Sequence, residues 1–245
     1  NPPKPDTTTP ATNTTDDLFS FVSPTEFVAL PSEGRFYPSN HPLHNVDTVE
    51  IRHMTAKEED ILTSEALLKK GVAINRMIDS VLVDKSIRVN DLLLGDKNAI
   101  LIAARISGFG PLYEVDTTCP ACKESATTVF NLEEMKPTAL PKKPKGITLL
   151  DNGHFATTLP KSQVTVTLRL LTTGDEERLM KNTEMKKKVK KIPSGLTDLL
   201  KTIIVSANDH TDRATLEKFV EMMPLPDVSY LRKRYEQAKP DMDVK

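Results

Sequence analysis

The spacing of apolar residues after position 70 predicts a helix with one buried face. Ile74, Met77, Ile78, Val81 and Leu82 follow the i, i+3, i+4, i+7, i+8 pattern. Side chains at these intervals lie on the same side of a helix. This is the clearest helix in the N-terminal half, and we expect it to pack against the core.

A second helix is predicted just upstream by its end signals. Thr55 and Glu58 have the spacing of a capping box, in which each side chain satisfies a backbone amide of the other residue. The helix is expected to run to about residue 69, where Gly71 ends it.

Two hairpins are predicted by short segments rich in β-branched and aromatic residues. Residues 113–118 and 126–130 flank the sequence Cys119-Pro-Ala-Cys122, which places both cysteines at a hairpin tip. Residues 155–159 and 164–170 form the second hairpin, with a turn around Pro160.

Further helices are predicted from capping residues and from apolar faces. Asp96 and Asp227 are expected to be N-caps, and Thr173 and Glu176 repeat the capping-box spacing. These helices are expected from 96 to about 108, from 173 onward, and over 196–207, 211–223 and 227–239. The predicted fold class is α+β: an N-terminal helical cluster with a zinc-ribbon-like β-hairpin, followed by a β-hairpin and a C-terminal helical bundle.

Composition shifts divide the chain into four parts. Residues 1–17 contain almost nothing to bury and are expected to form a disordered arm. Residues 136–146 are rich in proline and lysine and are expected to be a linker. The two predicted domains are therefore 18–135 and 147–245.

Charge and hydropathy exclude several function classes. The chain has 33 basic and 34 acidic residues, so no global field attracts it to nucleic acid or to an anionic membrane. No apolar run approaches the roughly 20 residues that span a bilayer. We therefore expect a soluble protein that stays in the reducing compartment where it is made. Because the sequence starts without methionine, we expect that it has been trimmed or is not the whole gene product.

Cys119 and Cys122 are the only residues whose pattern has chemical content. A tight turn at a hairpin tip directs two thiolates to one point, as half of a tetrahedral zinc site requires. His41 and His44 could complete such a site only if the fold brings them close. Inert turn cysteines remain an alternative, and a redox pair is a further one, although the flanking β-rich sequence does not favour it.

No enzyme is expected, because the common motifs of hydrolases, nucleotide-binding proteins and metalloproteases are absent from the sequence. The acidic groups 58–60 and 175–177 lie in predicted first helical turns, where unpaired amides stabilise carboxylates. The lysine-rich run 185–191 is interpreted as a solvated helix end in preference to a nucleic-acid site. Neither nucleic acid nor a small molecule is expected as a partner.

Three sequence blocks together resemble a known family. They are Leu-Pro-Ser-Glu-Gly-Arg-Phe-Tyr-Pro from Leu30, Glu-Ile-Arg-His-Met-Thr-Ala-Lys-Glu-Glu-Asp-Ile-Leu from Glu50, and the segment from Asp96 to Gly110 followed by the Cys-Pro-x-Cys hairpin. The resemblance is to the baseplate hub and hub-assembly proteins of T-even-like contractile-tailed phages, and it covers about residues 25–243.

This resemblance implies a role in protein binding and not in catalysis. The partners would be other baseplate and tail proteins, with assembly in the host cytoplasm and a final place in the virion. Members of the family continue into a second Cys-x-x-Cys hairpin that would complete a four-cysteine zinc ribbon. The resemblance thus supports Cys119 and Cys122 as zinc ligands, in a site that this chain leaves incomplete.

Aromatic residues near the N-terminus are the candidate interface anchors. Phe27, Phe36 and Tyr37 lie in or next to the expected extended segment, and aromatic side chains often dominate interface energies. The alternative is that they fasten the N-terminus to the protein's own core. Two rival functions also stay open: a hub-assembly chaperone that is absent from the virion, and a zinc-binding or nucleic-acid-binding regulator.

Overall fold

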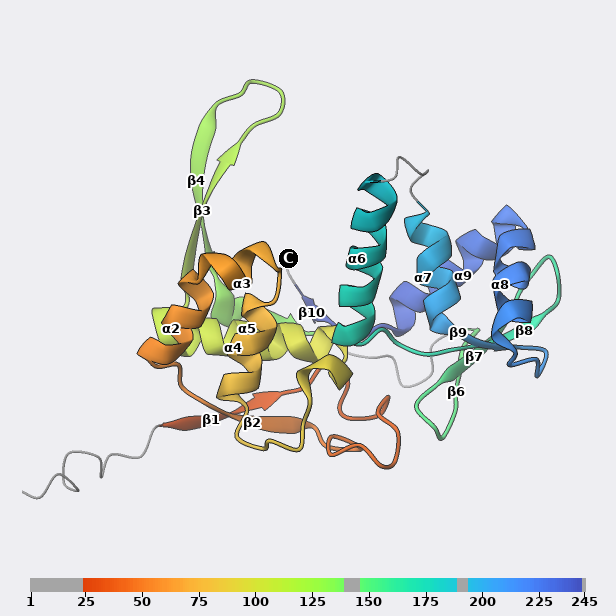
Figure 1. Ribbon diagram of the computed structural model, residues 1–245, viewed down its shortest axis with the longest axis horizontal. Helices are drawn as coiled ribbons and strands as arrows, with labels where there is room; N and C mark the ends of the chain where they lie inside the picture. Colours follow the sequence, from red (N-terminus) through yellow and green to blue (C-terminus); the bar gives the residue numbers. More distant parts are fainter. Residues whose placement is uncertain (1–23, 139–145, 189–193, 244–245) are drawn as a thin grey trace, which may run out of the picture.

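The N-terminal part of the chain is a two-stranded sheet next to a cluster of helices (Figure 1). The computed structural model describes residues 24–138, 146–188 and 194–243. The expected arm at 1–17 and most of the expected linker lie outside these residues. The elements of this part are β1 (Thr25–Ala29), β2 (Thr48–Arg52), α2 (Ala56–Thr63), α3 (Glu65–Lys69), α4 (Ala73–Val81), the 3₁₀ turn η1 (Val89–Asp91) and α5 (Leu94–Phe109).

The predicted amphipathic helix is confirmed as α4, with one difference. Met77, Ile78, Val81 and Leu82 are buried, whereas Ile74 in the first turn is exposed. In the first turn, Ala73 takes the buried position on the same face as Met77 and Val81.

The helix predicted from Thr55 is two helices. Thr55 and Glu58 form the expected capping box at the start of α2. Ser64 interrupts the helix because its backbone is extended, and its carbonyl then accepts the amides of Leu67 and Leu68 in α3. The expected end at Gly71 is confirmed, since its φ of 68° lies in the left-handed region that glycine tolerates.

A long antiparallel hairpin follows α5 and projects away from the body (Figure 1). It consists of β3 (Leu112–Thr118) and β4 (Ser125–Asn131), paired from Leu112↔Asn131 to Thr118↔Ser125. The predicted hairpin with its cysteines at the tip is confirmed. The turn η2 (Leu132–Glu134) then leads to the short strand β5 (Lys136–Pro137).

The described residues of the C-terminal part form an antiparallel sheet and four helices. Its strand order is β6-β7-β8-β9, and β10 near the C-terminus pairs with β5. The elements are β6 (Thr148–Leu149), β7 (Phe155–Thr158), β8 (Thr165–Leu168), α6 (Thr173–Lys188), α7 (Gly195–Ile203), β9 (Ile204–Ala207), α8 (Arg213–Met222), α9 (Leu225–Ala238) and β10 (Met242–Asp243).

One predicted helix end and one predicted capping pair in this part were wrong, whereas the predicted start of α6 at Thr173 is confirmed. Residues 204–207, expected to be helical, form β9, because the edge of β8 needs a backbone partner and the β-branched Ile204 and Val205 suit a strand. The capping box of α6 is Thr172 with Asp175, one residue before the predicted pair: the amide of each donates to the side chain of the other.

Buried side chains from both parts form one contiguous hydrophobic cluster. Ile51, Ile78 and Ile100 contribute from the N-terminal part, and Phe155 and Leu231 from the C-terminal part. Backbone hydrogen bonds between 92–94 and 171–173 also join the two parts. The α+β class is confirmed, while the division into two domains at 136–146 stays a prediction.

Candidate interaction surfaces

A buried carboxylate fastens the Leu-Pro-Ser-Glu-Gly-Arg-Phe-Tyr-Pro segment to the start of α5. The Asp96 carboxylate accepts hydrogen bonds from Ser32 N (3.0 Å), Ser32 Oγ (2.6 Å) and Tyr37 Oη (2.8 Å). All three residues are buried. Asp96 was predicted as an N-cap, but Leu93 holds that position, and the Asp96 side chain binds a distant segment instead.

The same segment contains a glycine that no other residue could replace without a backbone shift. Gly34 has a φ of 70°, and a Cβ there would lie 2.3 Å from the amide nitrogen of Val46. The turn therefore closes on itself, and Ser32 Oγ accepts the amide of Gly34. The segment is a compact loop whose shape is fixed by its own backbone contacts.

Burial changes the acidity of this network. Burial raises the pKa of Asp96 despite the hydrogen bonds that favour its charged form. Burial and the neighbouring Asp96 also raise the pKa of Tyr37 well above its ordinary value. Tyr37 therefore stays a hydrogen-bond donor, and the network is a structural feature of the loop.

The three predicted anchors have different positions. Tyr37 is 1% exposed, stacks on His41 with ring centroids 4.3 Å apart and accepts the Leu93 amide. Its position matches the alternative interpretation, because this side chain belongs to the protein's own core. Phe36 is partly buried, whereas Phe27 on β1 is 71% exposed. Phe27 is the one of the three that is well placed to contact a partner.

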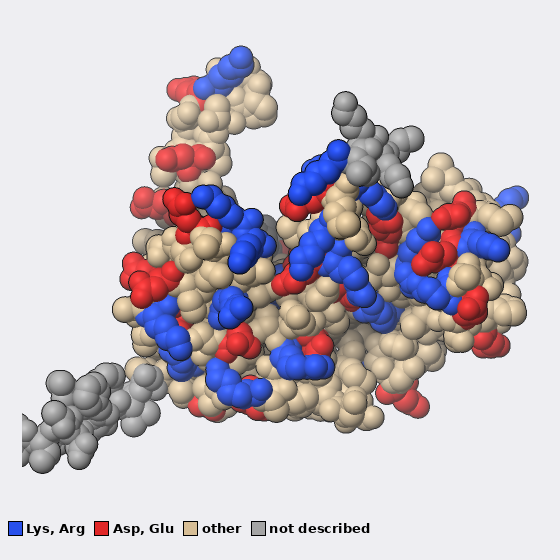
Figure 2. Space-filling view, viewed as in Figure 1, with Lys and Arg blue, Asp and Glu red and all other residues tan. Residues whose placement is uncertain are grey.

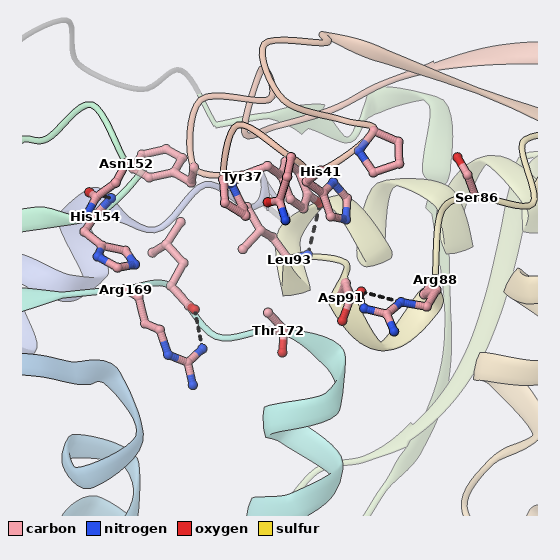
Figure 3. A pocket seen from close by; sticks show the side chains of 15 residues that line it. Tyr37, His41, Ser86, Arg88, Asp91, Leu93, Asn152, His154, Arg169 and Thr172 are labelled. Carbon is pink, nitrogen blue, oxygen red and sulfur yellow. Dashed lines mark hydrogen bonds and ion pairs between the residues drawn. The ribbon is translucent and has the colours of Figure 1, made fainter. Parts of the chain in front are cut away.

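A cavity of about 560 Å³ opens beside this loop (Figure 3). His41, Arg88 and Asp91 line one side, and His154 and Arg169 line the other. Burial lowers the pKa of His41, and burial with the nearby Arg169 lowers that of His154, so both rings are neutral at pH 7.

The hydrogen bonds around this cavity define what it can bind. His41 Nδ1 accepts the Leu43 amide at 3.1 Å, so the proton of the neutral ring lies on Nε2. Arg88 is paired with Asp91, and Arg169 with Asp175. The cavity thus combines paired charges with neutral imidazole rings, and the Nε2 atom of His41 is buried without a hydrogen-bond partner among the described residues. Four separate segments form it, and no local sequence signal could have predicted it.

The hairpin formed by β3 and β4 is almost entirely exposed. Of its 14 strand residues, only Val115 and Asn131 are partly buried. At the end of the hairpin that joins the body, which we call its foot, several apolar side chains are exposed, including Leu112, Tyr113, Val129 and Phe130. The sequence could have predicted that both faces of the hairpin are exposed, because each face carries threonine or acidic residues.

The cysteine pair lies at the hairpin tip, as predicted. Both thiols are free and exposed, and the Cys119 carbonyl accepts the Lys123 amide at 2.8 Å. Hydrogen bonds from the backbone amides of Cys122 and Ala121 lower the pKa of Cys119. Within the described residues, no group of three or more His, Cys, Asp or Glu side chains could hold a metal ion, so His41 and His44 do not complete the site.

The described part of the lysine-rich run is the end of α6. Lys186 Nζ contacts Ser194 Oγ and Asp198 Oδ2, each at 2.5 Å. Lys187 and Lys188 are exposed, and the rest of the run lies outside the described residues. The helical part of the interpretation is thus confirmed.

Comparison with known families decides the identity. A family model described as T4 bacteriophage base plate protein matches residues 24–242. The chain belongs to this family. No curated protein and no solved structure matches it significantly.

Membership of the base plate family indicates where the chain is located and what kind of partner it has. It is a T4-like phage baseplate protein, its place is the tail baseplate, and the family indicates a structural role with other phage tail proteins as partners. The match includes the buried Asp96 loop, the exposed hairpin and the C-terminal helices. Among the described residues, no helix is long and apolar enough to cross a membrane.

Proposed function

We propose that this chain is a structural subunit of the baseplate hub and acts by binding neighbouring tail proteins. The observation that carries the proposal is the family match over residues 24–242. The hub is favoured by the three sequence blocks that begin at Leu30, Glu50 and Asp96.

The form of the molecule supports a binding role. One core holds both parts together, and the hairpin with its bare apolar foot adds nothing to that core. Exposed apolar residues that cluster on a projecting element are typical of protein contact sites. Phe27 offers a second exposed aromatic contact on β1.

Quantitative mass spectrometry of purified phage particles and of infected-cell lysate tests the proposal. A structural subunit is expected in the particle at a fixed ratio to other baseplate proteins. Abundance in the lysate with absence from the particle would replace the proposal with the alternative, a hub-assembly chaperone. Isolated hubs, analysed in the same way, separate the hub from the outer baseplate.

We also propose that Cys119 and Cys122 supply two thiolates to a zinc site. Their exposed position at one tip and the lowered pKa of Cys119 fit this chemistry, and the remaining ligands would come from outside the pair. Elemental analysis of baseplates purified with zinc should find more bound metal with the wild-type chain than with Cys119→Ser/Cys122→Ser. A matched Thr118→Ser/Ser125→Ala variant should keep the metal, and equal metal contents in wild-type and Cys119→Ser/Cys122→Ser baseplates would remove the proposal.

The regulator alternative has a separate test. A zinc-binding or nucleic-acid-binding regulator would bind oligonucleotides through the lysines at the end of α6, and salt would weaken that binding steeply. Failure to bind at low salt removes this alternative.

A further inference from the structure

One face of the projecting hairpin combines acidic and apolar side chains. In the register of β3 and β4, Glu114 lies opposite Val129 and Asp116 opposite Thr127, so these side chains share one face with Leu112. All of these residues are exposed. We call Leu112, Glu114, Asp116 and Val129 the acidic face.

The opposite face of the hairpin already has a neighbour at its foot. The Arg105 guanidinium lies 5.0 Å from the centre of the Phe109 ring and 5.7 Å from that of Tyr113. These contacts are cation–π interactions within the chain. The acidic face therefore has fewer contacts within the chain than the opposite face. A two-stranded hairpin without a packed face is only marginally stable in water.

Helix α6 presents the complementary chemistry. Arg178, Lys181, Met185 and Lys188 are all exposed, and their spacing of three, four and three residues places them on one side of the helix. Met185 is 62% exposed and adds an apolar side chain to these cations. We call these four residues the basic face, with Glu184 on its flank.

The two faces are complementary in charge: Glu114 and Asp116 can meet Lys181 and Lys188, whereas Arg178 already pairs with the buried Asp175 and Lys181 lies 3.6 Å from Glu177. Each face also presents exposed apolar side chains. The seven residues of β3 extend about 20 Å, and the helix from Arg178 to Lys188 extends about 15 Å. The hairpin and α6 stand apart on the same side of the molecule (Figures 1 and 2), so they do not meet within one chain.

We propose that the acidic face of the hairpin docks on the basic face of α6 in a second copy of this chain. Such a contact joins different surfaces head to tail, which gives a ring when the rotation closes and a filament when it does not. The inference rests on the proposed function, because it names one partner of a baseplate subunit. A virion subunit that stays monomeric in solution would keep the proposed function and lose this inference.

The contact should be weak and sensitive to salt. A ribbon face of this length covers on the order of 200 Å², against about 800 Å² per partner in a stable interface. Exposed opposite charges are screened within about 10 Å at 0.1 M salt. Self-association of the isolated chain is thus expected in concentrated solution at low ionic strength.

Sedimentation velocity of the full chain up to about 1 mM, a concentration that detects millimolar contacts, tests the proposal. The wild type should associate at low salt and dissociate at high salt. Glu114→Lys/Asp116→Lys and Lys181→Glu/Lys188→Glu should each stay monomeric, and an equimolar mixture of the two variants should associate again.

The control is Lys218→Glu/Lys233→Glu, which makes the same change of charge at exposed positions on α8 and α9. This variant should associate like the wild type. The neutral variants Glu114→Gln/Asp116→Asn and Lys181→Gln/Lys188→Gln should also be monomeric, and circular dichroism should show every variant folded. A wild type that is monomeric throughout, or association that the charge reversals leave unchanged, would overturn the inference.

Discussion

Two buried carboxylates join segments that are distant in the sequence. Asp96 holds the loop that contains Ser32 and Tyr37. Asp227, predicted as a helix cap, instead accepts the amides of Lys161 and Ser162 in the turn between β7 and β8. The sequence signals were correct that an acid begins each helix. They could not show that the side chain is directed to a tertiary partner.

Loss of the Asp96 carboxylate should be strongly destabilising. Asp96→Ala leaves the buried Ser32 amide, Ser32 hydroxyl and Tyr37 hydroxyl without their acceptor. We expect the free energy of unfolding to fall by roughly 3 kcal/mol. Urea unfolding measures this, with Asp60→Ala on the exposed side of α2 as the control, expected within about 0.5 kcal/mol of wild type. Equal effects of the two substitutions would contradict the assigned network.

Glu58 should make stability depend on pH. Burial opposes its ionisation, but hydrogen bonds from Arg52, Ser80 and Thr55 outweigh burial and lower the pKa of Glu58. Its contribution is therefore present above the unfolded pKa of about 4.3 and is lost as pH falls toward the lower folded pKa.

Glu58→Gln is expected to reduce the free energy of unfolding by about 3 kcal/mol at pH 7. The difference from wild type should shrink steadily below pH about 4.3. Glu59→Gln, at the exposed neighbouring position, should follow the wild-type pH profile. A difference between Glu58→Gln and wild type that stays constant from pH 7 to pH 3 would show that Glu58 is not held in its charged form.

At the scale of elements, the hairpin of β3 and β4 is independent of the core. None of its residues belongs to the hydrophobic cluster. Replacing residues 114–129 by a short glycine-containing turn should therefore change Tm by less than about 2 °C, because a loss of 1 kcal/mol shifts Tm by about 2–4 °C at this chain size. Thermal unfolding followed by circular dichroism tests this, and a larger fall would mean that the hairpin stabilises the body.

The contact between α5 and the C-terminal segment decides whether alanine at Gly95 stabilises or destabilises the protein. Alanine usually favours a helix over glycine by about 1 kcal/mol. At Gly95, however, a Cβ would lie 2.2 Å from the carbonyl oxygen of Pro240. Gly95→Ala is thus expected to destabilise the protein by about 1–3 kcal/mol, whereas Gly195→Ala in α7, where nothing lies within 4 Å, should be neutral or stabilising. Chemical denaturation of both variants is the measurement, and a stabilising Gly95→Ala would place the C-terminal segment elsewhere.

Sequence patterns predicted helices and hairpins correctly where the element depends only on nearby residues. The periodicity of α4, the capping box at Thr55 and both hairpins needed no distant contact. The strand β9 could not be predicted in this way, because Ile204–Ala207 becomes a strand only by pairing with β8. The break at Ser64 likewise depends on one residue that adopts an extended conformation.

At the scale of the whole molecule, the sequence indicated the family and the positions of the exposed cysteines. It did not indicate which aromatic residues face outward: Tyr37 is in the core, and Phe27 is exposed. The cavity between His41 and His154 also depends on the packing of distant segments. Burial and tertiary neighbours, which one sequence does not encode locally, decide these features.

The central claim is that a baseplate subunit uses its projecting hairpin to bind neighbours. Hydrogen–deuterium exchange mass spectrometry of the free chain and of purified baseplates tests it most directly, followed on peptides within residues 112–131. We expect rapid exchange in the free chain and exchange slowed at least about tenfold in the baseplate, because docking protects the exposed ladder. Equally rapid exchange in both states, with the chain present in the baseplate, would contradict the account.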